Sequence, residues 1–199
     1  MRIGLIDVDK KNFPNLALMK ISAWHKAQGD EVEFANYLTY YDKVYMSKVF
    51  DFAYSEDADE PVLAKEIIKG GTGYDLQNKL PEEIEHMMPD YSLYMEFINK
   101  QTEGDPAKIK RLYNDYMNYS IGFTTRGCIR QCGFCVNRLL NRVVKWSPID
   151  EFLDPSRPAI YLWDDNIMAA PPKVFKEVMD SLQATNKPFQ FRQGMDIRL

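Results

Sequence analysis

All three cysteines of the chain lie within eight residues, in the stretch RGCIRQCGFC from Arg126 to Cys135. Their spacing, C-x-x-x-C-x-x-C, places three thiols on one loop, where they can converge on a single metal centre. An odd and tightly clustered set of cysteines cannot form a disulfide framework, and it fits a reducing compartment. We therefore interpret Cys128, Cys132 and Cys135 as metal ligands.

The number of thiols separates three kinds of site. A structural zinc ion normally takes four Cys or His ligands, and the two histidines, His25 and His86, fall in the first half of the chain. A redox pair would use only Cys132 and Cys135 and would leave Cys128 unexplained. An iron–sulfur cluster held by three thiolates leaves one iron open to a substrate or cofactor. Three thiols are the number that such a cluster requires. A zinc site and unrelated free thiols are the alternatives.

The segment around the cysteines predicts alternating strands and helices. Strands are predicted at residues 119–125, 159–163 and 189–192. Helices are predicted around residues 139–145, after an N-cap at Ser147 followed by Pro148, and from Pro171 through Leu182. The polar residues at the strand ends are placed where α/β barrels keep their sites.

The first hundred residues predict a separate α/β domain. Strands are predicted at residues 2–8, 31–35 and 43–50, with helices from Leu16 to Gly29 and at 61–68. Strand, helix and strand in this order predict a parallel sheet covered by helices. The polar stretch 99–105 marks the boundary, and a capped helix is expected after Asp105. The expected domains are 1–100 and 119–199, joined by a helical linker, 101–118.

Composition excludes several classes of protein. With 45% hydrophobic and 27% charged residues, the chain can bury a core and is not typical of disorder. The net charge of −4 gives no general argument for a nucleic-acid or membrane partner. Neither a signal peptide nor a membrane-spanning run is found in the sequence. These features predict a soluble cytoplasmic protein.

The cysteine motif, with Phe134 as the aromatic residue before Cys135, closely resembles that of the radical S-adenosylmethionine (SAM) enzymes. Further stretches resemble members of that superfamily with an N-terminal cobalamin-binding-like domain. They are residues 122–128, 163–166 and 193–199, and more weakly 17–20, 26–30 and 70–74. The resemblance covers nearly the whole chain, and its cysteine motif is the specific part.

The resemblance implies an α/β fold with two parts. The first is a flavodoxin/Rossmann-like parallel-sheet domain, and the second comprises the first βα units of a partial, TIM-like radical SAM barrel. It also implies that Cys128, Cys132 and Cys135 hold a [4Fe-4S] cluster whose fourth iron binds SAM. Reductive cleavage of SAM then gives a 5′-deoxyadenosyl radical, which abstracts a hydrogen from a substrate that these residues do not identify.

The implied partner is an electron donor such as flavodoxin or ferredoxin. Nucleic acid is a further possible partner, which the acidic net charge does not support. From residue 126 to 149 the chain has five basic residues and no acid. This run could stabilise a reduced cluster, dock an acidic electron donor or contact RNA, or it could be an ordinary solvated helix face.

Several residues are expected to contact the cofactor. Phe134 is the first, by its place in the cysteine motif. Many relatives carry a Gly-Gly-Glu stretch that contacts the SAM amino group, and here Asp164, Asp165 and Asn166 occupy that place. A carboxylate facing an ammonium is a sensible substitute, although such residues also cap helices. Contacts to the ribose or carboxylate of SAM are expected from Gln193, Asp196 and Arg198, for which ordinary strand-end polarity is the alternative.

The chain departs from the family pattern in two respects. Cobalamin-dependent relatives bind cobalt through a histidine after the first strand, and residues 9–15 contain none, so cobalamin is not expected. A radical SAM barrel also needs more βα units than these 199 residues supply. This favours a truncated chain, which could hold a cluster poorly and be inactive alone. A partner that completes the barrel and a different fold of the second domain are the alternatives. The half-barrel would leave a sheet edge unpaired, which invites association. The alternative function is a zinc-binding or iron–sulfur interaction module without catalysis.

Overall fold

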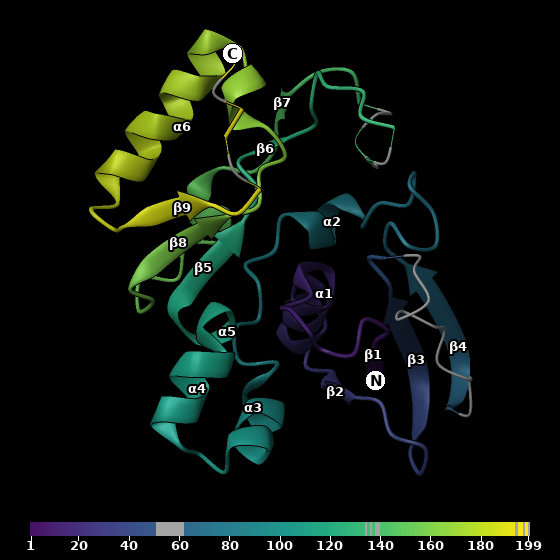
Figure 1. The fold of residues 1–199 in the computed structure, drawn as a ribbon. Coiled ribbons are helices and arrows are strands. Elements are labelled where there is room, and N and C mark those ends of the chain that lie inside the picture. The colour runs from purple at the N-terminus through teal and green to yellow at the C-terminus, as the bar shows by residue number, and fades with distance from the viewer. Residues whose placement is uncertain are drawn as a thin grey trace. The chain divides into compact units, whose positions relative to one another are not determined.

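A computed structural model of the chain describes residues 1–50, 62–133, 135, 137, 140–193, 195, 196 and 198 (Figure 1). The chain divides into two compact units, Met1–Tyr116 and Met117–Leu199. Both units combine strands with helices, so the predicted α/β class is confirmed. Within the described part of the chain, no helix is long and apolar enough to cross a membrane.

The first unit is built on a four-stranded parallel sheet in the order β2-β1-β3-β4. The strands are β1 (Arg2–Asp7), β2 (Glu31–Phe34), β3 (Tyr40–Ser47) and β4 (Leu63–Gly70). In the register of the sheet, Ile3 of β1 pairs with Val32 of β2 and with Lys43 of β3. The sheet is consistent with a Rossmann-like domain.

Helix α1 (Leu16–Ala27) follows β1 as predicted. The side chain of Asn15 caps it by accepting a hydrogen bond from the backbone N–H of Leu18 at 3.2 Å. The helix ends at Ala27, and Gly29 soon after it has a φ of +80°, a left-handed conformation that glycine adopts without strain. Leu18 and Met19 of this helix are buried.

The connection from β2 to β3, residues 35–39, is short for a crossover between parallel strands. Because β1 lies between β2 and β3, this connection crosses β1 closely, and it does so at Gly4. A Cβ atom at Gly4 would lie 3.1 Å from Ala35 and from the ring of Tyr41. The absence of a side chain at this position therefore permits the tight crossover.

Strand β4 replaces the helix that was predicted at residues 61–68, so that prediction is wrong; residue 61 itself lies outside the described residues. Its apolar residues fit one face of a helix as well as a strand. Val44 and Tyr45 of β3 pair with Ile67 and Ile68, so the open edge of β3 decides the outcome.

The remainder of the first unit is helical. The helices are α2 (Glu82–Glu85), α3 (Met95–Thr102), α4 (Pro106–Leu112) and the start of α5 (Asn114–Asn118). Helix α4 begins as predicted, because the Asp105 carboxylate accepts the backbone N–H of Ala107 at 2.8 Å.

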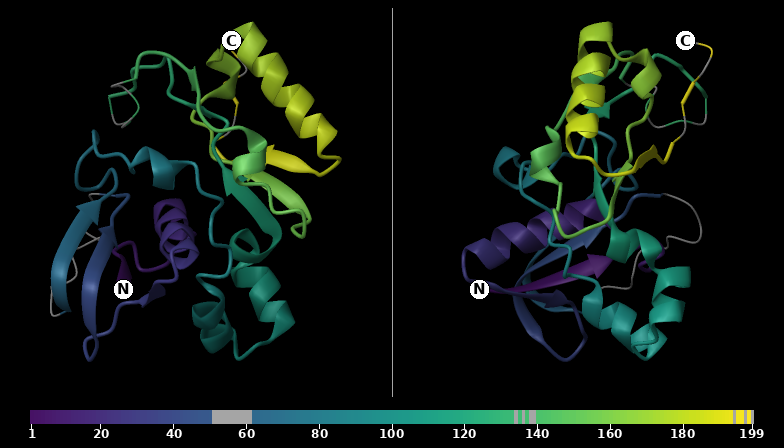
Figure 2. Two further views of the ribbon diagram at one scale, coloured as in Figure 1. Left: turned by 180° about the vertical axis from the view of Figure 1, so that it is seen from behind. Right: turned by 90° about the vertical axis from the view of Figure 1, so that its left-hand side faces the viewer.

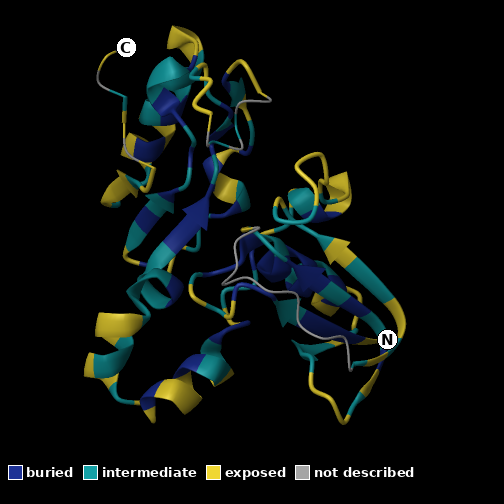
Figure 3. Ribbon diagram, turned by 45° about the vertical axis from the view of Figure 1, so that its right-hand side comes forward, coloured by how far each residue is buried: buried dark blue, intermediate teal, exposed yellow. Residues whose placement is uncertain are grey.

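The second unit contains a three-stranded parallel sheet in the order β5-β8-β9. The strands are β5 (Tyr119–Gly122), β8 (Ala159–Leu162) and β9 (Phe189–Phe191), close to their predicted positions. Helix α6 (Pro172–Ala184) runs along one face of this sheet (Figure 2). Its Val178 and Leu182 belong to a buried core with Ile160 and Leu162 of β8. Figure 3 colours the buried parts of the ribbon dark blue.

Between β5 and β8 the predicted helices do not form. Val144–Lys145 is a short strand, β7, paired antiparallel with β6 (Thr125–Arg126), so the predicted helix at 139–145 is wrong there, while residues 138 and 139 lie outside the description. Ser147 does not cap a helix either. A 3₁₀ turn, η2 (Ile149–Glu151), follows Pro148 without any side-chain cap. A second 3₁₀ turn, η3 (Ile167–Ala169), follows β8.

Candidate functional site

The cysteine loop, residues 127–135, follows β5 and β6 at the carboxyl end of the second sheet. Cys128 and Cys135 are partly buried, Cys132 is exposed, and all three are free thiols. The backbone N–H of Cys135 donates to the carbonyl of Cys132 at 3.0 Å, which closes a turn between them. No group of three His, Cys, Asp or Glu side chains among the described residues is arranged to hold a metal ion.

Cys128 is the cysteine with the most defined surroundings. Its sulfur accepts hydrogen bonds at 3.3 Å from the backbone N–H of Arg130 and from the side-chain amide of Asn166. Two N–H donors directed at one sulfur favour a negatively charged thiolate or a metal-bound sulfur. Hydrogen bonds to ligand sulfurs of this kind are also among the features that tune iron–sulfur clusters.

Asn166 is itself buried, with 5% of its surface exposed. Its side-chain oxygen, Oδ1, has no hydrogen-bond partner among the residues that the structure describes. A buried acceptor without a donor is uncommon and indicates a position that a bound group could complete. Asn166 precedes η3, yet its side chain does not cap that turn.

Asp164 anchors the start of the cysteine loop. Its Oδ1 accepts three hydrogen bonds, each at 2.6 Å. The donors are the hydroxyls of Thr124 and Thr125 and the backbone N–H of Thr125. Its Oδ2 accepts the backbone N–H of Thr124 at 3.0 Å. The side chain is 1% exposed, and this burial raises its pKa although the threonine hydrogen bonds oppose the shift.

Asp165 continues the attachment. Its Oδ2 accepts the backbone N–H of Gly127 at 2.7 Å. Gly127 has a φ of +98°, and a Cβ atom there would collide with the carbonyl oxygen of Arg142. Three successive residues after β8, namely Asp164, Asp165 and Asn166, therefore hold the chain from Thr124 to Cys128.

Asp196, in the segment after β9, joins that segment to the same loop through ion pairs. The Asp196 carboxylate accepts hydrogen bonds from Nε of Arg130 and from Nε of Arg198, each at 2.8 Å. The hydrogen bond from Arg198, followed by that from Arg130, holds the pKa of Asp196 well below its usual range. Asp196 and Arg198 are thus brought to the cysteine loop. Gln193 is exposed, and no hydrogen bond within the described part of the chain brings it there.

Phe134, the aromatic residue of the cysteine motif, lies outside the described residues. The described members of the basic run do not lie on one continuous helix. The guanidinium of Arg126 stacks on Phe123 at 3.3 Å from the ring centroid, and Lys145 pairs with Glu177 at 3.1 Å. This distribution favours separate roles for the basic side chains over a single solvated face.

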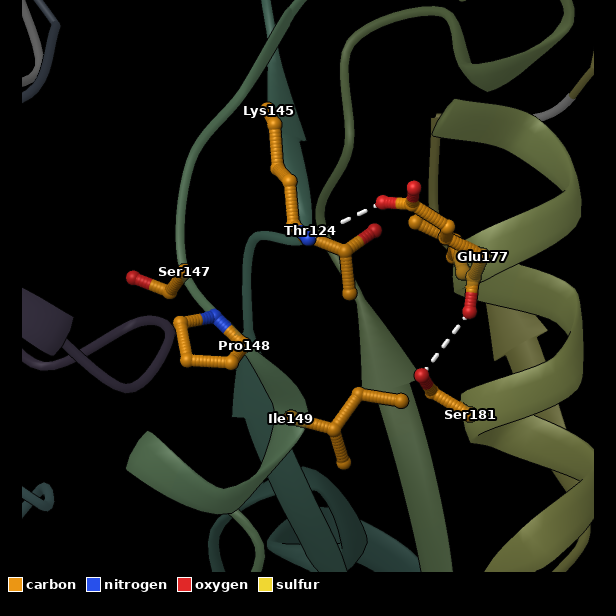
Figure 4. Close-up of a pocket in the computed structure, with 8 residues that line it drawn as sticks. Thr124, Lys145, Ser147, Pro148, Ile149, Glu177 and Ser181 are labelled. Atoms are coloured by element: carbon orange, nitrogen blue, oxygen red, sulfur yellow. Dashed lines mark hydrogen bonds and ion pairs between the residues drawn. The ribbon is translucent and has the colours of Figure 1, made fainter. Parts of the chain in front are cut away.

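A small cavity lies between β7 and α6 (Figure 4). Its volume is about 50 Å³, and the Lys145–Glu177 ion pair spans its edge. Sites for cofactor-sized molecules are roughly 300–1,000 Å³. This cavity is therefore suited to a few water molecules and is not a candidate for SAM.

The first unit offers no free histidine for a metal at its sheet edge. His25 lies in α1 and is buried, and its ring nitrogens contact Asp30 at 2.6 Å and the Tyr45 hydroxyl at 3.0 Å. In the loop after β1, the Asp9 carboxylate accepts the backbone N–H of Val49 at 2.7 Å. Both groups are thus engaged within the chain.

The sequence did not identify Thr124, Thr125 and Gly127 as parts of the site. Two hydroxyl residues directly after a strand, followed by glycine and cysteine, were visible in the stretch GFTTRGC. Their partners, Asp164 for the two threonines and Asp165 for Gly127, lie about forty positions away and are brought near only by the pairing of β5 with β8.

Comparison with known proteins identifies no relative: no protein-family model matches the chain, and no match is found among curated proteins or solved structures.

Proposed function

We propose that this chain is a radical SAM protein in which Cys128, Cys132 and Cys135 hold a [4Fe-4S] cluster. The observation that carries the proposal is the pair of N–H groups, from Arg130 and Asn166, that donate to the sulfur of Cys128. Proteins hold cluster ligands in this way. Bound there, a cluster together with SAM would supply a 5′-deoxyadenosyl radical for hydrogen abstraction.

The three residues after β8 are assigned two different roles, attachment of the loop and binding of SAM. The carboxylate of Asp164 is fully used by Thr124 and Thr125, so its role is to hold the loop. Asn166 retains a buried acceptor, Oδ1, beside Cys128. We assign the SAM amino group to this acceptor and to the second oxygen of Asp165, because an ammonium needs acceptors around it.

Asp196 and Arg198 remain candidates for contacts to the ribose or carboxylate of SAM. An arginine can bind a carboxylate by two hydrogen bonds, so the carboxylate is assigned to Arg198 and the ribose hydroxyls to Asp196. Phe134 and Gln193 are kept as predicted cofactor contacts on the strength of their sequence positions alone. The substrate is unknown, and the proposed partner is a low-potential donor such as flavodoxin or ferredoxin. Thiolate ligands and reducing chemistry support the proposal of a cytoplasmic location.

The finer fold assignment belongs to the same proposal. The strand order β2-β1-β3-β4 equals the first four strands of the flavodoxin-like order, which supports a cobalamin-binding-like first domain. Strands β5, β8 and β9, with α6 between the last two, are compatible with the first units of a TIM-like barrel. Cobalamin is not proposed, because the loop after β1 has no histidine and His25 is engaged by Asp30 and Tyr45.

Anaerobic reconstitution followed by metal analysis tests the proposal. We expect iron and acid-labile sulfide in about equal amounts in the parent protein, and neither in a variant with all three cysteines changed to alanine. Stoichiometric zinc without sulfide would instead support the zinc-binding interaction module. A cluster whose spectrum is unchanged by SAM would support an iron–sulfur module without catalysis.

A further inference from the structure

Asp196 joins two arginines beside the cysteine loop. Its side chain, 12% exposed, accepts Nε of Arg130 at 2.8 Å. It also accepts Arg198 in a forked contact, at 2.8 Å to Nε and 3.1 Å to a terminal nitrogen. We call Arg130, Asp196 and Arg198 the arginine clamp.

The clamp is attached to the cysteine loop through Arg130. The backbone N–H of Arg130 donates to the sulfur of Cys128, so this one residue ties the sulfur to Asp196. Arg198 pairs with Asp196, and this contact raises the pKa of Arg198. Asp196 therefore holds both guanidiniums at the loop.

The three side chains of the clamp carry one net positive charge, since two guanidiniums share one carboxylate. Arginine side chains are long and flexible, and an exposed one is held in place only by a partner. Arg198 is 75% exposed and Arg130 38% exposed, and Asp196 provides that partner for both. A positive charge fixed beside a cluster favours its reduced, more negative state.

We propose that Asp196 is a positioning residue, which holds the Arg130 and Arg198 guanidiniums at the cysteine loop so that their charge stabilises the reduced state of the cluster. The inference rests on the proposed function. Asp196 acts through the arginines and need not touch the cluster. The electron comes from a low-potential one-electron donor, and no proton or bond is exchanged in this step.

The first test needs no cluster. Hydrogen–deuterium exchange of residues 128–132 is compared between the parent chain and Asp196→Ala before reconstitution. Exchange should become faster in the variant, because Arg130 loses its anchor. Asp180→Ala is the matched control, since Asp180 pairs with the exposed Lys176 on α6 at 2.6 Å. Equal exchange in parent, Asp196→Ala and control would contradict the anchoring role.

The second test measures the electronic role. Arg130→Gln is made in the parent and in Asp196→Ala. For each protein the ratio of reduced to oxidised cluster is measured at one fixed ambient potential. In the parent, the ratio of reduced to oxidised cluster should fall about threefold, the size typical of one partly exposed charge. In Asp196→Ala it should hardly change, because Arg130 is no longer held there.

Equal effects of Arg130→Gln in both backgrounds, or none in the parent, would overturn the inference while leaving the proposed function intact. Absence of a cluster from the reconstituted parent would contradict the proposed function, and the electronic role with it. The exchange experiment would still decide whether Asp196 holds the loop.

Discussion

The side-chain amide of Asn166 donates a hydrogen bond to the sulfur of Cys128 across 3.3 Å. This contact joins the residues after β8 to the first cysteine of the loop after β5 and β6, two segments that are distant in sequence and adjacent in the sheet. It places a polar side chain with a free acceptor at the proposed cluster. The chemistry assigned to the loop depends on this relationship.

Asn166→Ala should retain the cluster and weaken its response to SAM. The three cysteines remain, but the N–H donor to Cys128 and the acceptor proposed for the SAM amino group are both removed. We expect SAM affinity, measured by titrating the cluster spectrum, to fall about tenfold, as for the loss of a hydrogen bond to a charged group. The exposed Asn141→Ala serves as control; unchanged SAM affinity in Asn166→Ala would refute its proposed role.

Gly127→Ala should destabilise the cysteine loop. The residue needs a φ of +98°, and its Cβ would strike the carbonyl oxygen of Arg142. A cost of about 2 kcal/mol in the free energy of unfolding is expected, together with less iron bound per chain after reconstitution. Gly133→Ala is a control from the same loop, because a Cβ there meets no atom within 4 Å. Full iron binding by both variants would argue against a defined loop geometry.

Asp164→Ala should destabilise the second unit more than any other single change after β8. Its removal leaves the buried N–H groups of Thr124 and Thr125 without their acceptor, at a cost of about 3 kcal/mol. Urea denaturation measures this cost, and the exposed Asp150→Ala is the control. A loss equal to that of the control would show that the four hydrogen bonds of Asp164 do not hold the loop.

The first unit should lose stability as pH rises, because of Asp7. Burial raises the pKa of Asp7 to about 6, while the Tyr94 hydroxyl, 2.8 Å away, and Lys11 oppose this shift and Asp9 adds to it. The folded state binds the proton more tightly than the unfolded state, so the favourable contribution is complete below the unfolded pKa, about 4. It is lost as pH rises towards about 6, and amounts to about 3 kcal/mol.

Asp7→Asn removes this ionisation and keeps an acceptor for Tyr94. Urea denaturation at about pH 4 and about pH 7 should show the variant gaining about 3 kcal/mol relative to the parent between the two values. The exposed Asp150→Asn controls for the loss of one carboxyl. A difference between variant and parent that stays constant with pH would contradict the account of Asp7.

The sequence predicted those features that depend on local pattern. Helix α1, with its Asn15 cap and glycine end, is one example, and the cysteine spacing is another. Features decided by tertiary pairing were not predicted. Leu63–Gly70 became a strand because the edge of β3 was open, and Val144–Lys145 became one because β6 was its partner. The attachment of Asp164 to Thr124 likewise needs β5 and β8 side by side.

Electron paramagnetic resonance of the anaerobically reconstituted, dithionite-reduced protein, recorded with and without SAM, tests the central claim most directly. The account predicts a [4Fe-4S]⁺ signal that shifts on addition of SAM and is lost when Cys128, Cys132 and Cys135 are changed to alanine. A protein that binds zinc and gives no cluster signal, or a cluster signal that SAM leaves unchanged, would contradict it.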